Sequence, residues 1–200
     1  MKRLLLALVL LPLGTHAVES EEVAACAVKQ NTVERLSCFD ELASRHSLAP
    51  TTVDTTGKAG TGTWVTRTST DPMTDTSIHM AFLLAESGRS KYGNSIALVA
   101  RCSNNKTEMW VDWQSYLGNR NTSVTHRVGK EKPKTASWHL SADNKATFFP
   151  TSPVALLKSM TETNSFVANV TPYNENPVTA VFDTTGAAEA LADIRNDCKW

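Results

Sequence analysis

The chain has 200 residues, with 20 Lys and Arg against 20 Asp and Glu. The charge is balanced and no block of like charge occurs, which excludes a protein that binds nucleic acid or a membrane surface mainly by electrostatics. One hydrophobic core usually spans about 100 to 200 residues, so we expect one principal domain.

The first residues have the composition of a secretory signal peptide. Lys2 and Arg3 precede the apolar run 4–13, and Ala17 is the small residue that a signal peptidase requires. The run is shorter than the roughly 20 residues needed to cross a bilayer. We predict a signal peptide over residues 1–17 and an exported mature chain, without a membrane span, that starts near Val18.

Residues 21–44 have a helical pattern. Asn31 followed by Glu34 resembles a capping box, and Leu36 and the apolar residues after it recur at helical spacing. We predict an N-terminal helical hairpin over residues 18–46. The stretch 47–61 is rich in Thr, Gly, Ala and Pro without periodicity, which predicts a linker.

Residues 62–200 are predicted to form a β-rich domain. The most informative stretch is 95–113, which reads as two strands joined by the polar turn 103–106, where Asn tolerates positive φ. Both faces of its first strand are largely apolar, so we expect that strand to be covered on both sides. Further strands are predicted over 62–69, 76–85, 121–128, 135–141, 146–149, 166–170 and 178–182.

Two helices are predicted in the C-terminal part. Ser152 as N-cap and Pro153 at the first position begin one of them. The last helix places four residues on a single stripe that must face the core: Ala187, Leu191, Ile194 and Cys198. The predicted fold class is α+β: a mainly antiparallel, sandwich-like β-sheet domain with an N-terminal disulfide-stapled helical hairpin and a C-terminal helix packed on the sheet.

The four cysteines favour disulfides, because thiols oxidise outside the cytosol. Four cysteines permit three pairings. The helical hairpin would bring Cys26 next to Cys38, and in that case Cys102 pairs with Cys198. A zinc site is the alternative, but the sequence has neither a CxxC pair nor a His at ligand spacing. A lipobox ending at Cys26 is a minority interpretation, because three glutamates separate it from the apolar run.

A recognition patch is one interpretation of the charged and aromatic residues on or near the central strands. Arg and aromatic side chains dominate the hot spots of protein interfaces. The structural alternative, which we favour, is a cross-strand ion pair between Arg101 and Asp112. If a binding face exists, we expect it at Arg101, Asp112, Trp113, Tyr116 and Arg127.

Catalytic and metal-binding patterns are absent from the sequence. His79, His126 and His139 lie on predicted strands, but there is no G-x-S-x-G, no H-E-x-x-H and no free Cys if both disulfides form. Asp71 and Asp75 flank a turn, which we interpret as structural rather than as a calcium site. We predict no enzyme, no catalytic residue, no cofactor and no metal.

An ordered set of segments carries a family resemblance. The set consists of 35–43, Trp64, 71–75, 99–102, 110–113, 116–117, Arg127, Trp138, Gly186 and 198–200. Taken together, and spanning nearly the whole mature chain, it resembles the VasI family, also called TagO, of bacterial type VI secretion-associated proteins.

The resemblance implies a periplasmic accessory protein of a type VI secretion system, with no established catalytic residues. The expected partners are unidentified components of that apparatus or peptidoglycan. The leading hypothesis is a non-enzymatic adaptor that acts by protein contact. The alternatives are a peptidoglycan-acting enzyme or cell-wall-binding factor that assists assembly of the apparatus and, more weakly, an effector or its immunity protein.

Overall fold

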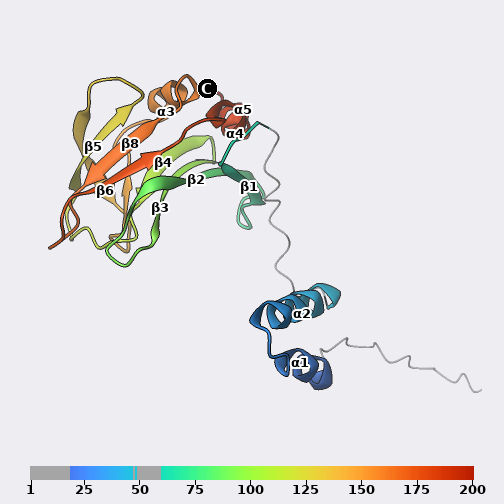
Figure 1. Cartoon of the computed structure of the whole chain (residues 1–200). Helices are drawn as coiled ribbons and strands as arrows, with labels where there is room; N and C mark the ends of the chain where they lie inside the picture. Colours follow the sequence, from blue (N-terminus) through green and yellow to red (C-terminus); the bar gives the residue numbers. More distant parts are fainter. Residues whose placement is uncertain (1–18, 47, 49–59) are drawn as a thin grey trace, which may run out of the picture. The chain divides into compact units, whose positions relative to one another are not determined.

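The computed structural model describes residues 19–46, 48 and 60–200, and the chain divides into two compact units, residues 1–52 and 53–200 (Figure 1). The predicted signal peptide and most of the predicted linker lie outside the described residues. Among the helices that are described, none combines the length and apolar content needed to cross a bilayer.

The described part of the smaller unit is a helical hairpin, as predicted. Helices α1 (Ser20–Ala27) and α2 (Thr32–Arg45) are joined by a disulfide between Cys26 and Cys38, whose Cα atoms are 5.4 Å apart. The Asn31 side chain accepts a hydrogen bond from the Glu34 amide at 3.3 Å, which is half of the predicted capping box. Leu36 is exposed rather than packed, so the disulfide supplies a constraint that the small apolar face of α2 does not.

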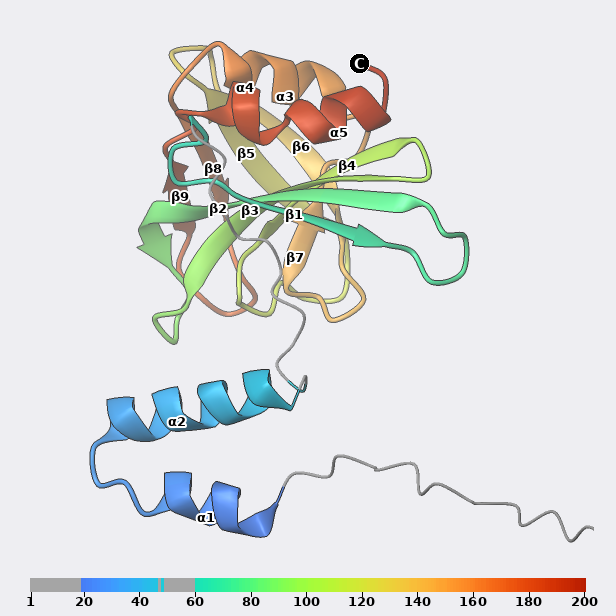
Figure 2. The same ribbon diagram turned by 90° about the vertical axis from the view of Figure 1, so that its right-hand side faces the viewer.

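The larger unit is a closed antiparallel barrel (Figure 2). Eight strands pair in the order β2, β3, β4, β7, β6, β5, β8 and β9, and β9 pairs back to β2, while β1 flanks the first half of β2. Their bounds are β1 Val65–Thr70, β2 Ser77–Arg89, β3 Ser95–Ser103, β4 Lys106–Asp112, β5 Thr122–Val128, β6 Lys134–Leu140, β7 Ala146–Phe148, β8 Phe166–Val170 and β9 Val178–Phe182.

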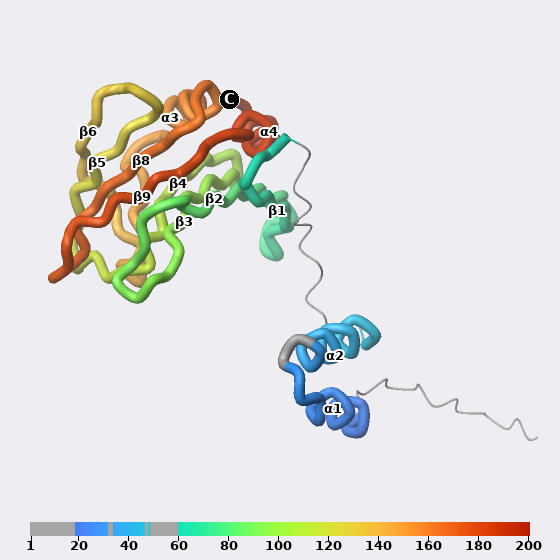
Figure 3. The backbone as a smooth tube through the Cα atoms, viewed as in Figure 1, coloured from blue at the N-terminus to red at the C-terminus, as the bar shows by residue number. Residues whose placement is uncertain are grey.

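The closure corrects the predicted sandwich-like sheet. Strand β2 has 13 residues, enough to pair with β1 near its start and with β9 near its end. Gly88, at φ +90°, allows this contact, because a Cβ there would lie 2.2 Å from the carbonyl oxygen of Thr179. Figure 3 traces β9 and β2 side by side where the barrel closes.

The β3–β4 hairpin forms where it was predicted. Asn104 and Asn105 make a two-residue turn with φ of 50° and 57°, the left-handed pair typical of a type I′ turn. The inward residues of β3, such as Leu98, are buried, and Val99 on the outer face is also 4% exposed, between its register partners Phe82 and Trp110.

The hydrophobic core fills the barrel and the space beneath the helices at one end of it (Figure 2). Its largest side chains, all fully buried, are Trp64, Trp113, Trp138, Phe166 and Phe182. The helices are α3 (Val154–Thr161), α4 (Ala187–Ala190) and α5 (Ala192–Asp197).

Two predicted helix features need correction. Helix α3 begins after Pro153, which is its N-cap, so Ser152 does not cap it. The predicted single C-terminal helix is two short helices that meet at Leu191, whose φ and ψ are −90° and 0°. The predicted stripe nevertheless faces the core, because Ala187, Leu191 and Ile194 are all buried.

The second disulfide joins Cys102 of β3 to Cys198, just after α5, with Cα atoms 5.9 Å apart and a sequence separation of 96. This is the predicted pairing. It connects the C-terminal segment to the central hairpin.

Candidate functional site

The predicted ion pair between Arg101 and Asp112 does not form. In the register of the hairpin Arg101 lies opposite Glu108, and its guanidinium contacts the Glu108 carboxylate. Asp112 instead accepts hydrogen bonds from the side chain and backbone of Gln114, at 2.6 and 3.2 Å. The predicted partner was wrong by four residues along β4, although Arg101 does form an ion pair with a carboxylate of that strand.

The other predicted patch residues are not gathered around Arg101. Trp113 is buried, and its indole N–H donates to the Thr147 hydroxyl at 2.9 Å. Tyr116 is exposed and packs edge-to-face on Tyr173, with ring centroids 5.9 Å apart. Arg127 is exposed on β5, and three strands lie between β3 and β5 in either direction around the barrel.

A different cluster surrounds Arg101 on the outer face of the barrel. Glu108 also accepts a hydrogen bond from Lys106 at 2.8 Å, and the Arg101 guanidinium lies over the Trp110 ring at 5.4 Å. Trp110 in turn stacks on Phe148 of β7, with centroids 5.1 Å apart. We call Arg101, Lys106, Glu108, Trp110 and Phe148 the outer cluster.

Charge pairing dominates the ionisation of Glu108. Partial burial acts to raise the pKa of its carboxyl, but the hydrogen bonds and charges of Lys106 and Arg101 outweigh burial, so the pKa lies below its usual value. Glu108 is therefore ionised at neutral pH. It holds the Arg101 side chain in one position against the Trp110 ring.

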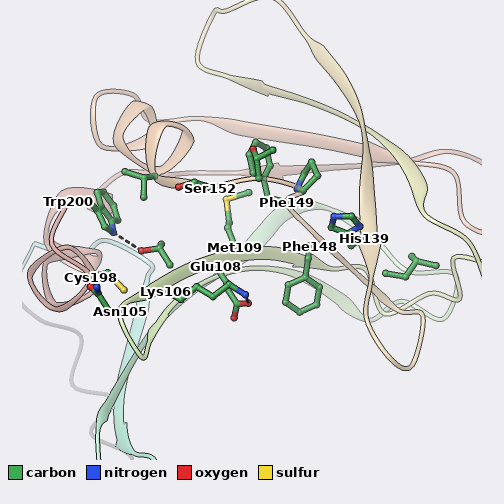
Figure 4. A pocket seen from close by; sticks show the side chains of 15 residues that line it. Asn105, Lys106, Glu108, Met109, His139, Phe148, Phe149, Ser152, Cys198 and Trp200 are labelled. Atoms are coloured by element: carbon green, nitrogen blue, oxygen red, sulfur yellow. Dashed lines mark hydrogen bonds and ion pairs between the residues drawn. The ribbon is translucent and has the colours of Figure 1, made fainter.

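A groove of about 620 Å³ lies beside the outer cluster. In Figure 4 Lys106 and Glu108 lie along one side, Ser152 and Phe149 along the other, Trp200 at one end and His139 at the opposite end. Its walls therefore come from the start of β4, the end of β6, the segment that leads from β7 into α3, and the C-terminal residues. We call it the β4 groove.

The groove exists because β7 is only three residues long. The last backbone hydrogen bond between β4 and the β7 segment runs from the Phe149 amide to the Met109 carbonyl at 2.9 Å. After Phe149 the chain leaves β4 and continues toward α3. Backbone N–H and C=O groups alternate in direction along a strand, so residues two apart point the same way. The groups of Met109 face β7, and those of Thr107 therefore point away from β3 as well, into the groove. Among the described residues Thr107 has strand pairing only to β3, which leaves an open strand edge.

The C-terminal Trp200 forms one end of the groove. Its indole N–H donates to the Thr107 hydroxyl at 2.9 Å, and its ring lies 5.8 Å from the Arg195 guanidinium and 5.9 Å from the Lys158 amine. The disulfide at Cys198 fixes the backbone two residues before Trp200. The end of the groove is therefore held by a covalent bond and a hydrogen bond.

Sequence reasoning missed the outer cluster, although the signal was present. With Asn104 and Asn105 as the turn residues, the register places Arg101 opposite Glu108 and not opposite Asp112. The role of Trp200 had no such signal, because its contact with Thr107 spans 93 residues of sequence.

The residues considered for catalysis do not converge. His79 lies on β2 and contacts the Thr68 hydroxyl at 3.0 Å, His126 points into the barrel from β5, and His139 is exposed on β6. Within the described ranges no group of three or more His, Cys, Asp or Glu side chains is placed to hold a metal.

The segment with Asp71 and Asp75 is a turn. The Asp71 carboxylate accepts a bond from the Met73 amide at 2.8 Å, and its carbonyl accepts one from the Asp75 amide at 2.9 Å. This is the structural interpretation given to it from the sequence.

The fold and the groove together define a small disulfide-linked β-barrel protein with an open strand edge on its side. A family model described as type VI secretion system VasI, EvfG matches residues 25–200. The chain belongs to this family and is a type VI secretion-associated protein.

Comparison with curated proteins gives no significant match. Among solved structures, the crystal structure of invasion associated protein B from Bartonella henselae is similar with a TM-score of 0.49 and 9% identity. That alignment covers 69% of this chain and 94% of the other.

Proposed function

We propose that this protein is a non-enzymatic periplasmic accessory of the type VI secretion system, and that it binds an extended segment of an apparatus subunit in the β4 groove. The observation that carries the proposal is the open edge of β4 at Thr107, beside the outer cluster. A strand edge with free backbone groups binds an extended peptide by adding it to the sheet.

The outer cluster supports the proposal because its side chains are held in place before a partner arrives. Arg101 is fixed by Glu108 and by the Trp110 ring, so little side-chain entropy remains to be lost on binding. Arg and Trp are also the residue types most enriched at energetic hot spots. The backbone edge would supply affinity, and the cluster would select the partner's side chains.

A periplasmic location fits the two disulfides, because such bonds persist in that compartment. The signal peptide remains a prediction. The cell-wall alternative also remains, since partly exposed aromatic rings such as Trp110 and Phe148 can stack on sugars as well as on peptide side chains.

The first test is capture of apparatus subunits by the tagged mature chain, residues 18–200, from cells that express the system. The native chain should recover a subunit, whereas Trp110→Ala and Arg101→Ala should recover much less of it. Arg127→Ala is the matched control, because it removes an exposed Arg that does not line the groove. Recovery of no subunit, or equal loss in all three variants, would contradict the proposal.

A second pair of variants isolates the strand edge. Thr107→Pro removes the amide that faces the groove and no bond to β3, and proline is tolerated on an edge of this kind. Thr107→Val keeps the amide and removes only the hydroxyl that binds Trp200. We expect Thr107→Pro to abolish capture and Thr107→Val to retain it, whereas the reverse result would place binding elsewhere.

The cell-wall alternative is tested on the same preparation. Zymography and cosedimentation with purified sacculi should give neither clearing nor pelleting of the native chain. Clearing would favour an enzyme, and pelleting abolished by Trp110→Ala would favour a wall-binding factor. A deletion strain, scored for secretion and killing of prey cells, shows whether the protein is required for the system.

A further inference from the structure

A second hollow lies at the end of the barrel beneath α3. Its volume is about 380 Å³, near the lower limit of sites that bind small ligands. Phe149, Thr151 and Ser152 line both this hollow and the β4 groove, so the segment 149–152 separates the two. Apolar walls come from Val128, Ala136, Phe149, Ala155 and Leu156.

His126 is the buried polar group of this hollow. It lies on the inward face of β5 with 7% of its surface exposed, and its ring packs on Trp138 and Phe149 at centroid distances of 5.6 and 5.7 Å. Its Nδ1 atom is fully buried and has no hydrogen-bond partner among the described residues. A buried polar atom without a partner typically costs about 1 to 3 kcal/mol, so a bound group that satisfies it is favoured.

The charges that face His126 come from the turn between β5 and β6 and from the first residue of β6. Burial lowers the pKa of the imidazole, the charge of Lys134 lowers it further, and Glu131 opposes them. The residues that α3 contributes, Ala155, Leu156 and Ser159, are uncharged. His126 is therefore neutral at pH 7 and carries one N–H donor.

Lys134 provides a positive charge at the rim. It is the direct register partner of His126, so the two side chains leave the same face of the β5–β6 pair. Its ion pair with Glu131, at 3.2 Å, joins two exposed groups and contributes little. The turn also carries Lys130 and Lys132, which leaves the rim net positive.

We propose that this hollow binds a small carboxylate with an apolar body, of the size of a medium-chain fatty acid. The carboxylate would pair with the Lys134 amine and accept a hydrogen bond from the His126 ring, and the apolar body would lie against Phe149, Leu156 and Val128. The proposal does not rest on peptide binding in the β4 groove, so its failure would leave the proposed function untouched.

The test is titration of the oxidised mature chain with octanoate, followed by calorimetry and by the NMR signal of the His126 ring. We expect saturable one-to-one binding and a shift of that signal, and octylamine at the same concentrations should not bind. Lys134→Gln should weaken octanoate binding about tenfold, as expected for loss of one charge-assisted contact. Lys132→Gln, which removes the same charge from the same turn but not from the hollow, should change it less than about twofold.

A third variant tests the hollow itself. Leu156→Trp fills it without changing any charge, so it should abolish octanoate binding while the thermal transition of the barrel persists. The proposal is overturned if octanoate does not saturate, if octylamine binds equally well, if both lysine variants weaken binding alike, or if Leu156→Trp still binds.

Discussion

At the scale of single residues, His126 and Trp138 each bury an unsatisfied polar atom, and their rings pack on one another in the barrel interior. The Nδ1 atom of His126 and the Nε1 atom of Trp138 are both buried without a hydrogen-bond partner among the described residues, and the rings meet at 61°. The aromatic packing that surrounds them stabilises the neutral imidazole and disfavours the charged one.

This environment predicts a pH dependence of stability. Because the pKa of His126 is lower in the folded chain than its ordinary value of 6.5, the unfolded chain binds the proton more readily between the two values. The free energy of unfolding should therefore fall as the pH drops from 7 toward 5. Urea denaturation of the native chain and of His126→Phe measures this, and the variant should lose that part of the slope.

His139 is the control for this prediction. It is exposed, and His139→Phe should leave the slope between pH 7 and 5 as it is in the native chain. A slope that survives in His126→Phe, or disappears in His139→Phe, would assign the pH dependence to another group.

Glu108 allows a second prediction at this scale. Glu108→Gln removes the negative charge that Arg101 and Lys106 share. Both cations keep access to water, so we expect the free energy of unfolding to fall by about 0.5 to 1 kcal/mol. Glu131→Gln, which breaks the more exposed pair with Lys134, should cost less. Urea midpoints at pH 7 compare the two, and a loss above about 2 kcal/mol for Glu108→Gln would show that the pair behaves as a buried one.

At the scale of elements, local chemistry in the sequence was enough to find most of the strands. The Asn-rich turn, the alternation in β3 and β4, and the short apolar runs of β8 and β9 are all local signals, and the strands lie where these signals predicted them. The C-terminal helix shows the limit. Its stripe satisfies helical spacing, but the break between α4 and α5 at Leu191 depends on packing over the barrel end, which periodicity does not encode.

The turn of the central hairpin supports a prediction at this scale. Asn105 has φ of 57°, a conformation that glycine adopts freely and alanine only with strain. Asn105→Ala should destabilise the barrel by about 1 kcal/mol, and Asn105→Gly should not. Chemical denaturation measures both, with Asn121→Ala as control because Asn121 is exposed and outside the left-handed region. Equal effects of the alanine and glycine variants would show that the turn does not depend on this conformation.

At the scale of the whole molecule, the closure of the barrel could not be predicted from the sequence. Inward and outward residues alternate in the same way in a sandwich and in a barrel, so the pattern fixes which face is buried and not which edges meet. The decisive pairing joins β2 to β9, Ser87 opposite Val181, and depends on the approach of two backbones at Gly88. The groove could not be predicted from the sequence either, because it results from the shortness of β7 and the position of Trp200.

The two disulfides could be predicted because the local pattern of the helical hairpin pairs Cys26 with Cys38, and this pairing leaves Cys102 for Cys198. The two bridges make unequal contributions to the whole molecule. The bridge of Cys26 to Cys38 closes a separation of 12 residues and lies wholly in the smaller unit, whereas that of Cys102 to Cys198 closes 96 residues and spans the barrel. In the chain-entropy model these loops contribute about 2 to 3 and about 4 to 5 kcal/mol.

Replacing each pair with alanine separates these contributions. All five tryptophans lie in the larger unit, so their fluorescence reports unfolding of the barrel alone. Cys102→Ala with Cys198→Ala should lower the urea midpoint strongly, since it also leaves a small cavity at the fully buried Cys102 and releases the backbone that holds Trp200 against Thr107. Cys26→Ala with Cys38→Ala should leave the fluorescence transition unchanged and reduce only the helical circular dichroism. Equal shifts of the fluorescence midpoint in the two double variants would mean that the helical hairpin and the barrel unfold as one cooperative unit.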